Sequence, residues 1–331
     1  MGRRVALALG AGGARGYAHI GAVQVIRERG HEIVTVAGTS MGALVGGVTA
    51  AGKLDEYTEW ATSLTQYDVW RLLDMNLGGG GAIRAERVIG KVADILDGAL
   101  IEDCPIPFTA VATDLNNRRE VWFQRGPVAT AIRASVAIPS LVTPVVVGGR
   151  LLVDGGLMNP VPIEPTTAVT SDLTIAVSLQ AGHTRGVDIE PASPVRSMSA
   201  LGESVRSLTS RVAARIVPER LAESGADAVA PQADPGAEVA PTASPEREAS
   251  PAEDGPGYLP APKDLSSTEV FNRSFDTMAS LITRYRMASN PPDVLVSVPS
   301  DACRTMDFHR AAEMVALGRR LTEQALDAAG L

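Results

Sequence analysis

The sequence predicts an α/β fold, a sheet covered by helices on its faces. Short β-branched, apolar runs alternate with stretches in which apolar residues recur every three or four positions. This alternation is typical of strands joined by helices. Strands are predicted over 5–9, 33–37, 107–112, 120–124, 145–147, 151–153, 173–179 and 294–298, and helices over 17–29, 41–51, 53–64, 84–97, 127–134, 270–282 and 308–328.

The first predicted strand, 5–9, is followed by a glycine-rich loop, Gly10 to Gly16, and then by a helix. The loop nearly matches the dinucleotide fingerprint G-x-G-x-x-G, but Arg15 stands where the third glycine belongs, so the match is weak. Successive backbone N–H groups at a helix start form an anion site. Beside a nucleophile, that anion would be the oxyanion of an acyl-transfer intermediate. Arg15 either adds positive charge or fixes the loop.

The second predicted strand, 33–37, leads into Gly38-Thr39-Ser40-Met41-Gly42 and then into a helical pattern. This is G-x-S-x-G at a strand-to-helix junction, the setting in which a sharp turn pushes a serine hydroxyl into a pocket. The pattern favours a serine hydrolase with Ser40 as the nucleophile. The alternative is a Gly/Ser-rich turn that only packs a helix closely on a strand.

A third segment, 145–153, is predicted to form a hairpin with a Gly148-Gly149 turn, and it delivers Asp154 followed by Gly155-Gly156. An aspartate at the end of an apolar strand is well placed for a pocket. Taken alone, Asp154 could equally cap a turn.

These segments carry a resemblance to a known family. The chain resembles the patatin-like phospholipases, especially stand-alone bacterial members similar to the catalytic domain of neuropathy target esterase. Four blocks carry the resemblance, in the family's order over roughly residues 3–180: the Gly12-Gly13-Ala14-Arg15 loop, the Gly38–Gly42 elbow, 133–139 (Arg-Ala-Ser-Val-Ala-Ile-Pro) and Asp154-Gly155-Gly156. The region from about 266 to 328 is similar in layout but less specific.

The resemblance implies a three-layer α/β/α fold with a central, mostly parallel sheet. It implies a Ser–Asp dyad without histidine, with Ser40 as nucleophile and Asp154 as base, acting on phospholipid or lysophospholipid esters with no cofactor and no metal. The oxyanion hole would be formed by Gly10, Gly12, Gly13, Ala14 and Arg15, and the nucleophile elbow by Gly38, Thr39, Met41 and Gly42.

Two alternatives stay open. A Ser–Asp–His triad would use His183, the one histidine of four that follows Ser40 and Asp154 in a suitable place, whereas His19, His31 and His309 are expected to be surface or packing residues. An α/β-hydrolase elbow normally follows several strands, and here it follows the second. The other alternative is a regulatory or scaffold protein that keeps the fold without turnover.

Composition narrows the function classes further. A net charge of −8 and a pI near 5.2 argue against general nucleic-acid binding. No apolar run approaches the roughly 18 residues that span a bilayer. Cys104 and Cys303 lack metal-ligand spacing and suggest buried thiols in a reducing compartment. We therefore expect a cytoplasmic protein, with peripheral contact at the inner face of the membrane as an open possibility.

The chain is expected to form a single hydrolase domain, 1–331, with a disordered Ala/Pro/Glu-rich insertion at 222–263. Residues 195–217 form a basic amphipathic pattern that either packs on the domain or lies on an anionic membrane. The glycines at 78–81 form a plain loop or border a flap over the site.

Overall fold

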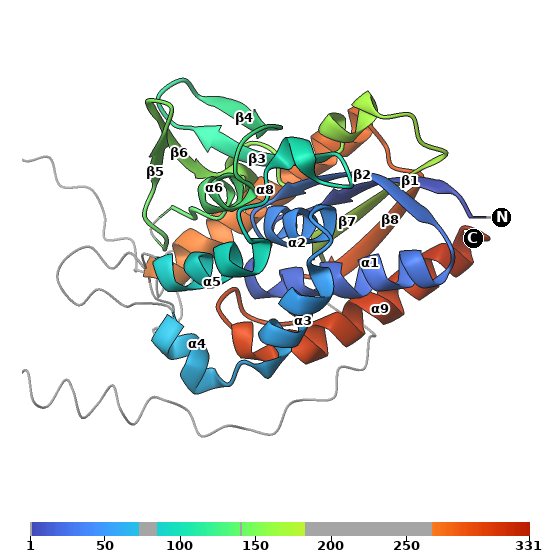
Figure 1. Cartoon of the computed structure of the whole chain (residues 1–331), viewed down its shortest axis with the longest axis horizontal. Helices are drawn as coiled ribbons and strands as arrows, with labels where there is room; N and C mark the ends of the chain where they lie inside the picture. The colour runs from blue at the N-terminus through green and yellow to red at the C-terminus, as the bar shows by residue number, and fades with distance from the viewer. Residues whose placement is uncertain (1, 73–84, 140, 183–266) are drawn as a thin grey trace, which may run out of the picture. The chain divides into compact units, whose positions relative to one another are not determined.

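The computed structural model describes residues 2–72, 85–139, 141–182 and 267–331 of the chain (Figure 1). Four expectations lie outside these residues: the glycine link at 78–81, His183, the amphipathic pattern at 195–217 and the insertion at 222–263. Everything below concerns the described residues.

The core of the domain is an eight-stranded sheet in the order β5-β6-β3-β2-β1-β7-β8, with β4 paired to β3 off this path. The pairs β1–β2, β1–β7, β2–β3 and β7–β8 are parallel, and those of β3–β4, β3–β6 and β5–β6 are antiparallel. The strands are β1 (Arg4–Leu9), β2 (Glu32–Thr39), β3 (Phe108–Asp114), β4 (Arg119–Phe123), β5 (Val145–Val147), β6 (Arg150–Asp154), β7 (Leu173–Ala181) and β8 (Val294–Pro299). All eight predicted strands are confirmed.

The helices also follow the predicted pattern, with small shifts at their ends. They are α1 (Ala18–Glu28), α2 (Met41–Ala50), α3 (Leu54–Ser63), α4 (Gln66–Leu72), α5 (Glu86–Leu96), α6 (Val128–Ser135), α8 (Ser267–Ser289) and α9 (Ala311–Ala328). The short helix α4 was not predicted. The first predicted helix, 17–29, is observed as α1, and a 3₁₀ turn over Gly13–Tyr17 directly precedes it.

The helices cover both faces of the sheet. Connections from β1 through β2 to β3 run in one direction across the sheet, and the β7–β8 connection runs in the other. Because such crossovers are right-handed, α1 and α2 lie on one face and α8 on the opposite face. Figure 1 shows α1 and α9 side by side in front of the sheet, with α8 behind it. This arrangement confirms the three-layer α/β/α fold.

This topology fixes where a site can form. The strand order reverses between β1 and β7, and in open parallel sheets ligands bind beyond the carboxyl ends of the strands at such a switch point. The glycine loop follows β1, the Ser40 elbow follows β2, and Gln180 lies at the end of β7. Segments far apart in the sequence therefore meet at one edge of the sheet.

Several smaller expectations can be compared with the fold. The hairpin at 145–153 is confirmed, with positive φ at both Gly148 and Gly149. Cys303 is buried, but Cys104 is partly exposed, which corrects the expectation of two buried thiols; both are free. Cys104 lies after a short 3₁₀ turn rather than inside a layer, so its thiol reaches the surface.

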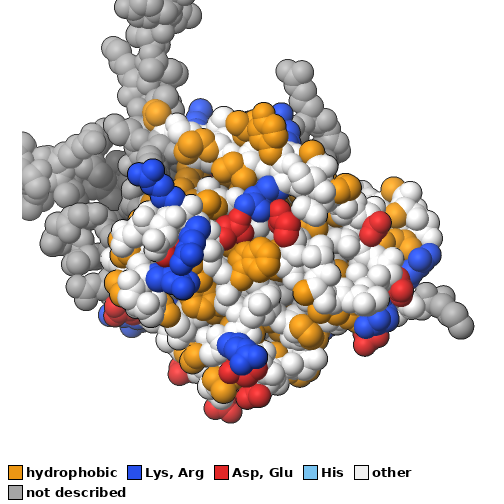
Figure 2. Space-filling model, turned by 90° about the horizontal axis from the view of Figure 1, so that it is seen from above, with side chains coloured by type: hydrophobic (Ala, Val, Ile, Leu, Met, Phe, Trp, Pro, Cys, Tyr) orange, Lys and Arg blue, Asp and Glu red, His pale blue; other side chains and the backbone are white. Residues whose placement is uncertain are grey.

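Two further features bear on membrane contact: the length and hydropathy of the helices, and the distribution of charged side chains on the surface. No helix within the described ranges is long and apolar enough to cross a bilayer. On the described part of the face in Figure 2, basic and acidic side chains are interspersed with hydrophobic ones rather than gathered into one basic area. Peripheral membrane contact stays a prediction.

Candidate active site

Ser40 lies on a strained turn between β2 and α2. Its backbone has φ 58° and ψ −123°, a conformation that residues other than glycine rarely adopt. Such strain persists only where the surrounding structure imposes it, and it is typical of functional sites. The Ser40 carbonyl accepts hydrogen bonds from the N–H groups of Ala43 and Leu44, so helix α2 starts directly at Ser40.

Gly38 and Gly42 let the backbone pass close to its neighbours. A Cβ atom at Gly38 would lie 2.2 Å from the Gly42 carbonyl oxygen, and one at Gly42 would lie 2.0 Å from the Leu9 carbonyl oxygen. At both distances the added Cβ atom would overlap the carbonyl oxygen. The two glycines of G-x-S-x-G are therefore required by close packing, of the end of β2 against the start of α2 at Gly38 and of α2 against the end of β1 at Gly42.

Ser135 supports the elbow from the side, a role that the sequence did not reveal. Its hydroxyl accepts a hydrogen bond from the Ser40 backbone N–H (2.8 Å) and donates one to the Val111 carbonyl (2.6 Å). The side chain is fully buried at the end of α6. It satisfies a buried N–H group that the sharp turn leaves without a partner of its own. The block at 133–139 was the available signal, but its pattern did not say which atom Ser135 would hold.

Replacing Ser135 with alanine is expected to lower kcat by about 10- to 100-fold. Leaving a buried N–H unsatisfied costs roughly 1–3 kcal/mol, and the elbow can escape this cost only by shifting Ser40. The measurement is kcat and KM on a p-nitrophenyl ester, together with the melting temperature. Thr49→Val is the matched control, because it removes a buried hydroxyl of α2 that bonds only its own helix, at Val45. Equal kcat losses in the two variants would contradict the assigned role of Ser135.

Asp154 reaches the site from the end of β6. Its backbone N–H donates to the Ala137 carbonyl (2.9 Å), and its Oδ1 atom accepts the Gly156 N–H (2.7 Å). The second bond is the turn-capping role that the sequence left open. Capping and catalysis use different oxygen atoms here, so the two roles are compatible.

The other carboxylate oxygen, Oδ2, is the one available for chemistry. It is buried and accepts no hydrogen bond of ordinary length and angle from the described residues. The Ser40 side chain nevertheless lies close enough to lower the pKa of Asp154. The two groups therefore lie next to each other without an aligned hydrogen bond. Catalytic hydrogen bonds are often long before substrate binds.

Burial sets the acidity of Asp154. The carboxyl group is almost fully buried, and the loss of hydration raises its pKa to about 6, against smaller lowering effects of Ser40 and the Gly156 N–H. A carboxylate with a raised pKa is a stronger base, and its pKa lies nearer to neutral pH. The group is therefore suited to accept a proton from an adjacent hydroxyl.

The glycine loop can be examined one backbone group at a time. The Gly10 N–H donates to Val177, the Ala11 N–H to Pro160 and the Ala14 N–H to Thr305. This corrects the expectation for Gly10 and Ala14, whose N–H groups are already used within the fold. The N–H groups of Gly12 and Gly13, which precede or begin the 3₁₀ turn and have no partner within it, remain as candidate oxyanion donors.

The Arg15 side chain fixes the conformation of the glycine loop. Its Nε atom donates to the Gly12 carbonyl (3.2 Å), and its Nη1 atom donates to the Ser300 carbonyl. A peptide unit is planar and trans, so holding the Gly12 C=O on one side directs the Gly13 N–H to the other. Of the two roles predicted for Arg15, the structure shows the fixing of the loop.

Gly13 requires glycine for two separate reasons. Its φ is +57°, and a Cβ atom there would lie 2.6 Å from the Thr305 carbonyl oxygen. Gly12 differs, because its φ of 168° is open to any residue, and what forbids a side chain is the Leu179 Cβ atom at 2.6 Å. Positive φ therefore requires glycine only at Gly13, whereas close packing excludes a side chain at both positions.

Gly13→Ala is expected to reduce kcat by about two to three orders of magnitude with a smaller change in KM, because the displaced loop would lose an oxyanion donor. Gly52→Ala is the control, since Gly52 also has positive φ (72°) but no atom within 4 Å of the added Cβ. Steady-state kinetics on the same ester decide the matter. A Gly13 variant that keeps the kcat of the Gly52 variant would remove Gly13 from the oxyanion hole.

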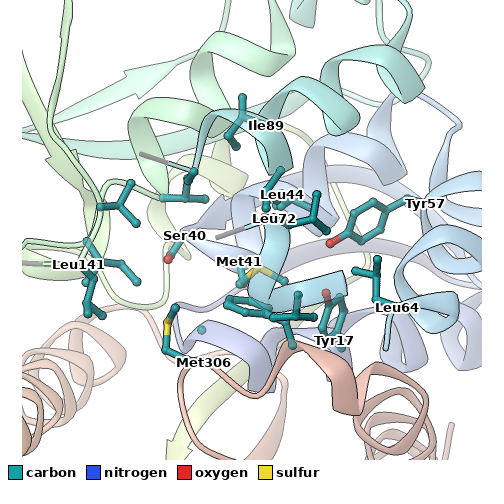
Figure 3. Close-up of a pocket in the computed structure, with 18 of the residues that line it drawn as sticks. Tyr17, Ser40, Met41, Leu44, Tyr57, Leu64, Leu72, Ile89, Leu141 and Met306 are labelled. Carbon is teal, nitrogen blue, oxygen red and sulfur yellow. The ribbon is translucent and has the colours of Figure 1, made fainter. Parts of the chain in front are cut away.

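An apolar pocket opens beside Ser40 (Figure 3). Its empty volume is about 830 Å³, part of it open to solvent. In the close-up, Ser40, Leu141 and Met306 lie at one end, and Tyr17, Tyr57 and Leu64 at the other. The walls are almost entirely hydrophobic: Met41, Leu44, Trp60, Val69, Leu72, Val88, Ile89, Val136, Ile138, Val142 and Phe308 complete the lining together with Gly13 and Ala85.

A second, more polar pocket meets the first at Ser40. It has an empty volume of about 520 Å³, and it contains both candidate oxyanion donors and Asp154. Gly13, Ser40, Ile138 and Leu141 line both pockets. The remaining walls come from Ala11, Arg15, Gln180, Phe275, Asp276 and Thr305. Ser40 thus stands where an apolar and a polar space join.

The histidines outside this junction act in packing. His19 is completely buried, and its Nε2 atom lies 2.8 Å from the Gly10 carbonyl oxygen, to which a neutral ring donates. Burial lowers the pKa of His19 to about 4. His31 is buried and accepts the Arg3 N–H. These two positions agree with the expected packing role.

An ion-pair cluster outside the pockets ties α8 to the Asp154 loop. Arg286 pairs with Glu120 and Glu164 and donates to the Met158 carbonyl. Asn159, in the same loop, accepts the Thr39 hydroxyl at its carbonyl oxygen (2.8 Å). The turn that holds Asp154 and the strand end that holds Ser40 are therefore directly linked. The sequence did not predict this contact, because the two residues are 120 positions apart.

Comparison with known proteins gives concordant matches. Residues 7–167 match the family model described as patatin-like phospholipase. An uncharacterized NTE family protein of Mycobacterium tuberculosis is 49% identical over 337 residues, spanning 98% of this chain and 92% of the relative. A lysophospholipase NTE1 of Cryptococcus neoformans is 33% identical over 170 residues, covering 50% of this chain and 10% of that protein. A Legionella pneumophila VipD crystal structure aligns with 13% identity and a TM-score of 0.42, covering 99% of this chain and 67% of that chain, which is too low to support an argument.

Proposed function

The chain belongs to the NTE family of patatin-like phospholipases, and this membership supports a lipid hydrolase activity. We propose that the protein is a serine esterase that hydrolyses lipid acyl esters with a Ser40–Asp154 dyad. One observation carries the proposal. A strained serine lies beside a buried carboxyl of raised pKa, at the junction of an apolar pocket and a polar pocket.

The dyad would act in two half-reactions. Asp154 Oδ2 takes the Ser40 hydroxyl proton as Oγ attacks the ester carbonyl, and the tetrahedral intermediate then collapses with proton transfer to the leaving alcohol. Water then attacks the acyl-serine as the same carboxylate takes its proton, and the second tetrahedral intermediate collapses with return of that proton to Ser40 Oγ and release of the fatty acid. Each step returns Asp154 to its starting state.

The oxyanion of each intermediate would be held by backbone groups. Gly12 and Gly13 line the polar pocket together with Ser40, so their N–H groups would be the donors, and the start of α2 adds the partial positive charge of a helix N-terminus. Fixing of the loop by Arg15 and His19 supports this role, since prealigned donors need no reorganisation during the reaction.

The two pockets suggest how an ester would bind. The apolar pocket suits one acyl chain, and the polar pocket suits the alcohol part. The second space is smaller and more polar than the first, so it favours an ester with a single long chain, such as a lysophospholipid, over one with two.

Labelling separates this proposal from its alternatives. A fluorophosphonate probe should modify the wild-type protein and not Ser40→Ala, and the wild-type protein should hydrolyse p-nitrophenyl butyrate until the probe inactivates it. A scaffold protein without turnover would show neither. If a His183 triad operates instead, His183→Ala should lose several orders of magnitude in rate, whereas the dyad predicts little change.

The rate should depend on pH through Asp154. Its carboxylate is the proton acceptor, and its pKa is raised to about 6, so kcat/KM should be low below that pH and rise to a plateau above it. A histidine base would give a similar rise of kcat/KM with pH. The pH dependence of kcat/KM is therefore recorded for the wild type and for His183→Ala. Loss of the rise in the variant would assign the titration to the histidine.

A further inference from the structure

The apolar pocket ends in a pair of tyrosines that the dyad does not use. Tyr17 and Tyr57 line this pocket at the end away from Ser40, and in the close-up their hydroxyl groups lie near each other (Figure 3). Both residues are almost fully buried, with 2% and 1% of their surface exposed. Tyr17 ends the 3₁₀ turn of the glycine loop and Tyr57 lies on α3, so two separate segments each bring a phenol group to one place.

These hydroxyl groups differ from the rest of the lining. Among the described residues around this pocket, the other polar side chains are Ser40, at the opposite end, and Trp60, whose ring packs on Tyr57 with the ring centroids 5.7 Å apart. Phenylalanine would form the same walls without burying a polar group. A buried hydroxyl costs free energy unless it has hydrogen-bond partners, so the partners of this pair need to be identified.

The two hydroxyl groups satisfy each other only in part. Burial raises the pKa of Tyr17 to about 12, against a lowering effect of its hydrogen bond with Tyr57, and burial also raises the pKa of Tyr57. Both groups therefore keep their protons at neutral pH. Among the described residues each hydroxyl hydrogen-bonds only with the other, and one such bond uses only one of the two protons. The pair keeps one donor and several lone pairs for a further partner.

We propose that Tyr17 and Tyr57 select acyl chains that carry a hydroxyl group at the end far from the ester. A hydroxyl group can accept the remaining proton of the pair and donate to one of its oxygen atoms, whereas a methyl group can do neither. The inference rests on the proposed esterase function and assigns the specificity of its acyl side. The dyad and the polar pocket are unchanged by it.

The test compares p-nitrophenyl esters that differ in one terminal group. A series of ω-hydroxyacyl esters, from hydroxyoctanoate to hydroxyhexadecanoate, is assayed below the concentrations at which the esters form micelles. Each is paired with the ester in which a methyl group replaces the terminal hydroxyl, and the ratio of the two kcat/KM values is recorded. Apolar walls disfavour a hydroxyl group, so the ratio should be below one for the shortest chains and rise to a maximum at the length that reaches the two tyrosines.

Tyr17→Phe is expected to lower this maximum by about three- to tenfold, the effect of one hydrogen bond, and to leave the ratio for the shortest chains unaltered. Both esters of a pair are measured on the same variant, so a general change in activity or in folded fraction cancels in the ratio. Tyr57→Phe should lower the maximum in the same direction, and it gives an independent result if Tyr17→Phe does not fold. Tyr285→Phe is the control, because it removes an exposed tyrosine hydroxyl of α8 outside both pockets and should leave every ratio unchanged.

Two results would overturn the inference while leaving the esterase function standing: a wild-type ratio without a maximum along the series, or a maximum that both phenylalanine variants retain. Failure of the function itself looks different. The methyl-terminated esters would then not be hydrolysed in a manner that depends on Ser40, and the inference would fall with it.

Discussion

Replacing Ser40 with alanine is expected to abolish ester hydrolysis, with a loss of at least about 10⁴-fold in kcat, because Ser40 is the only serine among the described residues that line the polar pocket with Asp154 and the glycine loop. The folded state should change little. The hydroxyl contributes almost no packing, and alanine removes no buried charge. The strained φ of 58° is retained, since Gly38 and Gly42 still impose the turn.

The measurement is hydrolysis of p-nitrophenyl butyrate with thermal melting of the same samples. Fluorophosphonate labelling of wild type and mutant identifies the modified residue by peptide mass. Turnover that persists at the wild-type rate in a folded Ser40→Ala protein would remove Ser40 from the mechanism. Ser63→Ala, at the surface end of α3, controls for the loss of a serine as such.

Asp154→Asn is expected to reduce kcat by about three to four orders of magnitude. The amide has nearly the same shape as the carboxyl group but cannot accept the Ser40 proton. Its side-chain oxygen can still accept the Gly156 N–H, so the turn is preserved. Asp114→Asn is the control, because Asp114 caps a turn at the end of β3 in a similar way but lies outside both pockets.

The same substitution has an opposite effect on stability. The pKa of Asp154 is raised in the folded protein to about 6, above the ordinary value of 3.8, so the native state binds the proton more tightly than the unfolded chain does. The protonated group is tolerated below pH 4, and stability falls as pH rises from about 4 to about 6. Asparagine removes this penalty, so the mutant should melt no lower than wild type at pH 8. A lower melting temperature at pH 8 would mean that the ionised carboxylate stabilises the fold.

The sequence by itself determined the architecture. Strands such as β1 and β2 are continuous apolar runs because both faces of a parallel sheet are buried, and this pattern survives in any context. Ser40 and Asp154 were also identifiable, because an elbow and a hairpin end have local signatures in glycines and strand residues. The helix α4 was missed, since seven residues offer too short a period to recognise.

The tertiary structure alone decided how these pieces work together. Only the parallel order β2-β1-β7 brings the glycine loop to Ser40, and only the folded structure shows that the Gly10 and Ala14 N–H groups donate to Val177 and Thr305. The support of Ser40 by Ser135, 95 residues away, and the approach of Asp276 to Arg15 are likewise set by packing. Local sequence encodes backbone conformation and burial, whereas the partner of a given N–H or carboxylate depends on which distant elements the sheet places beside it, and no local pattern records that choice.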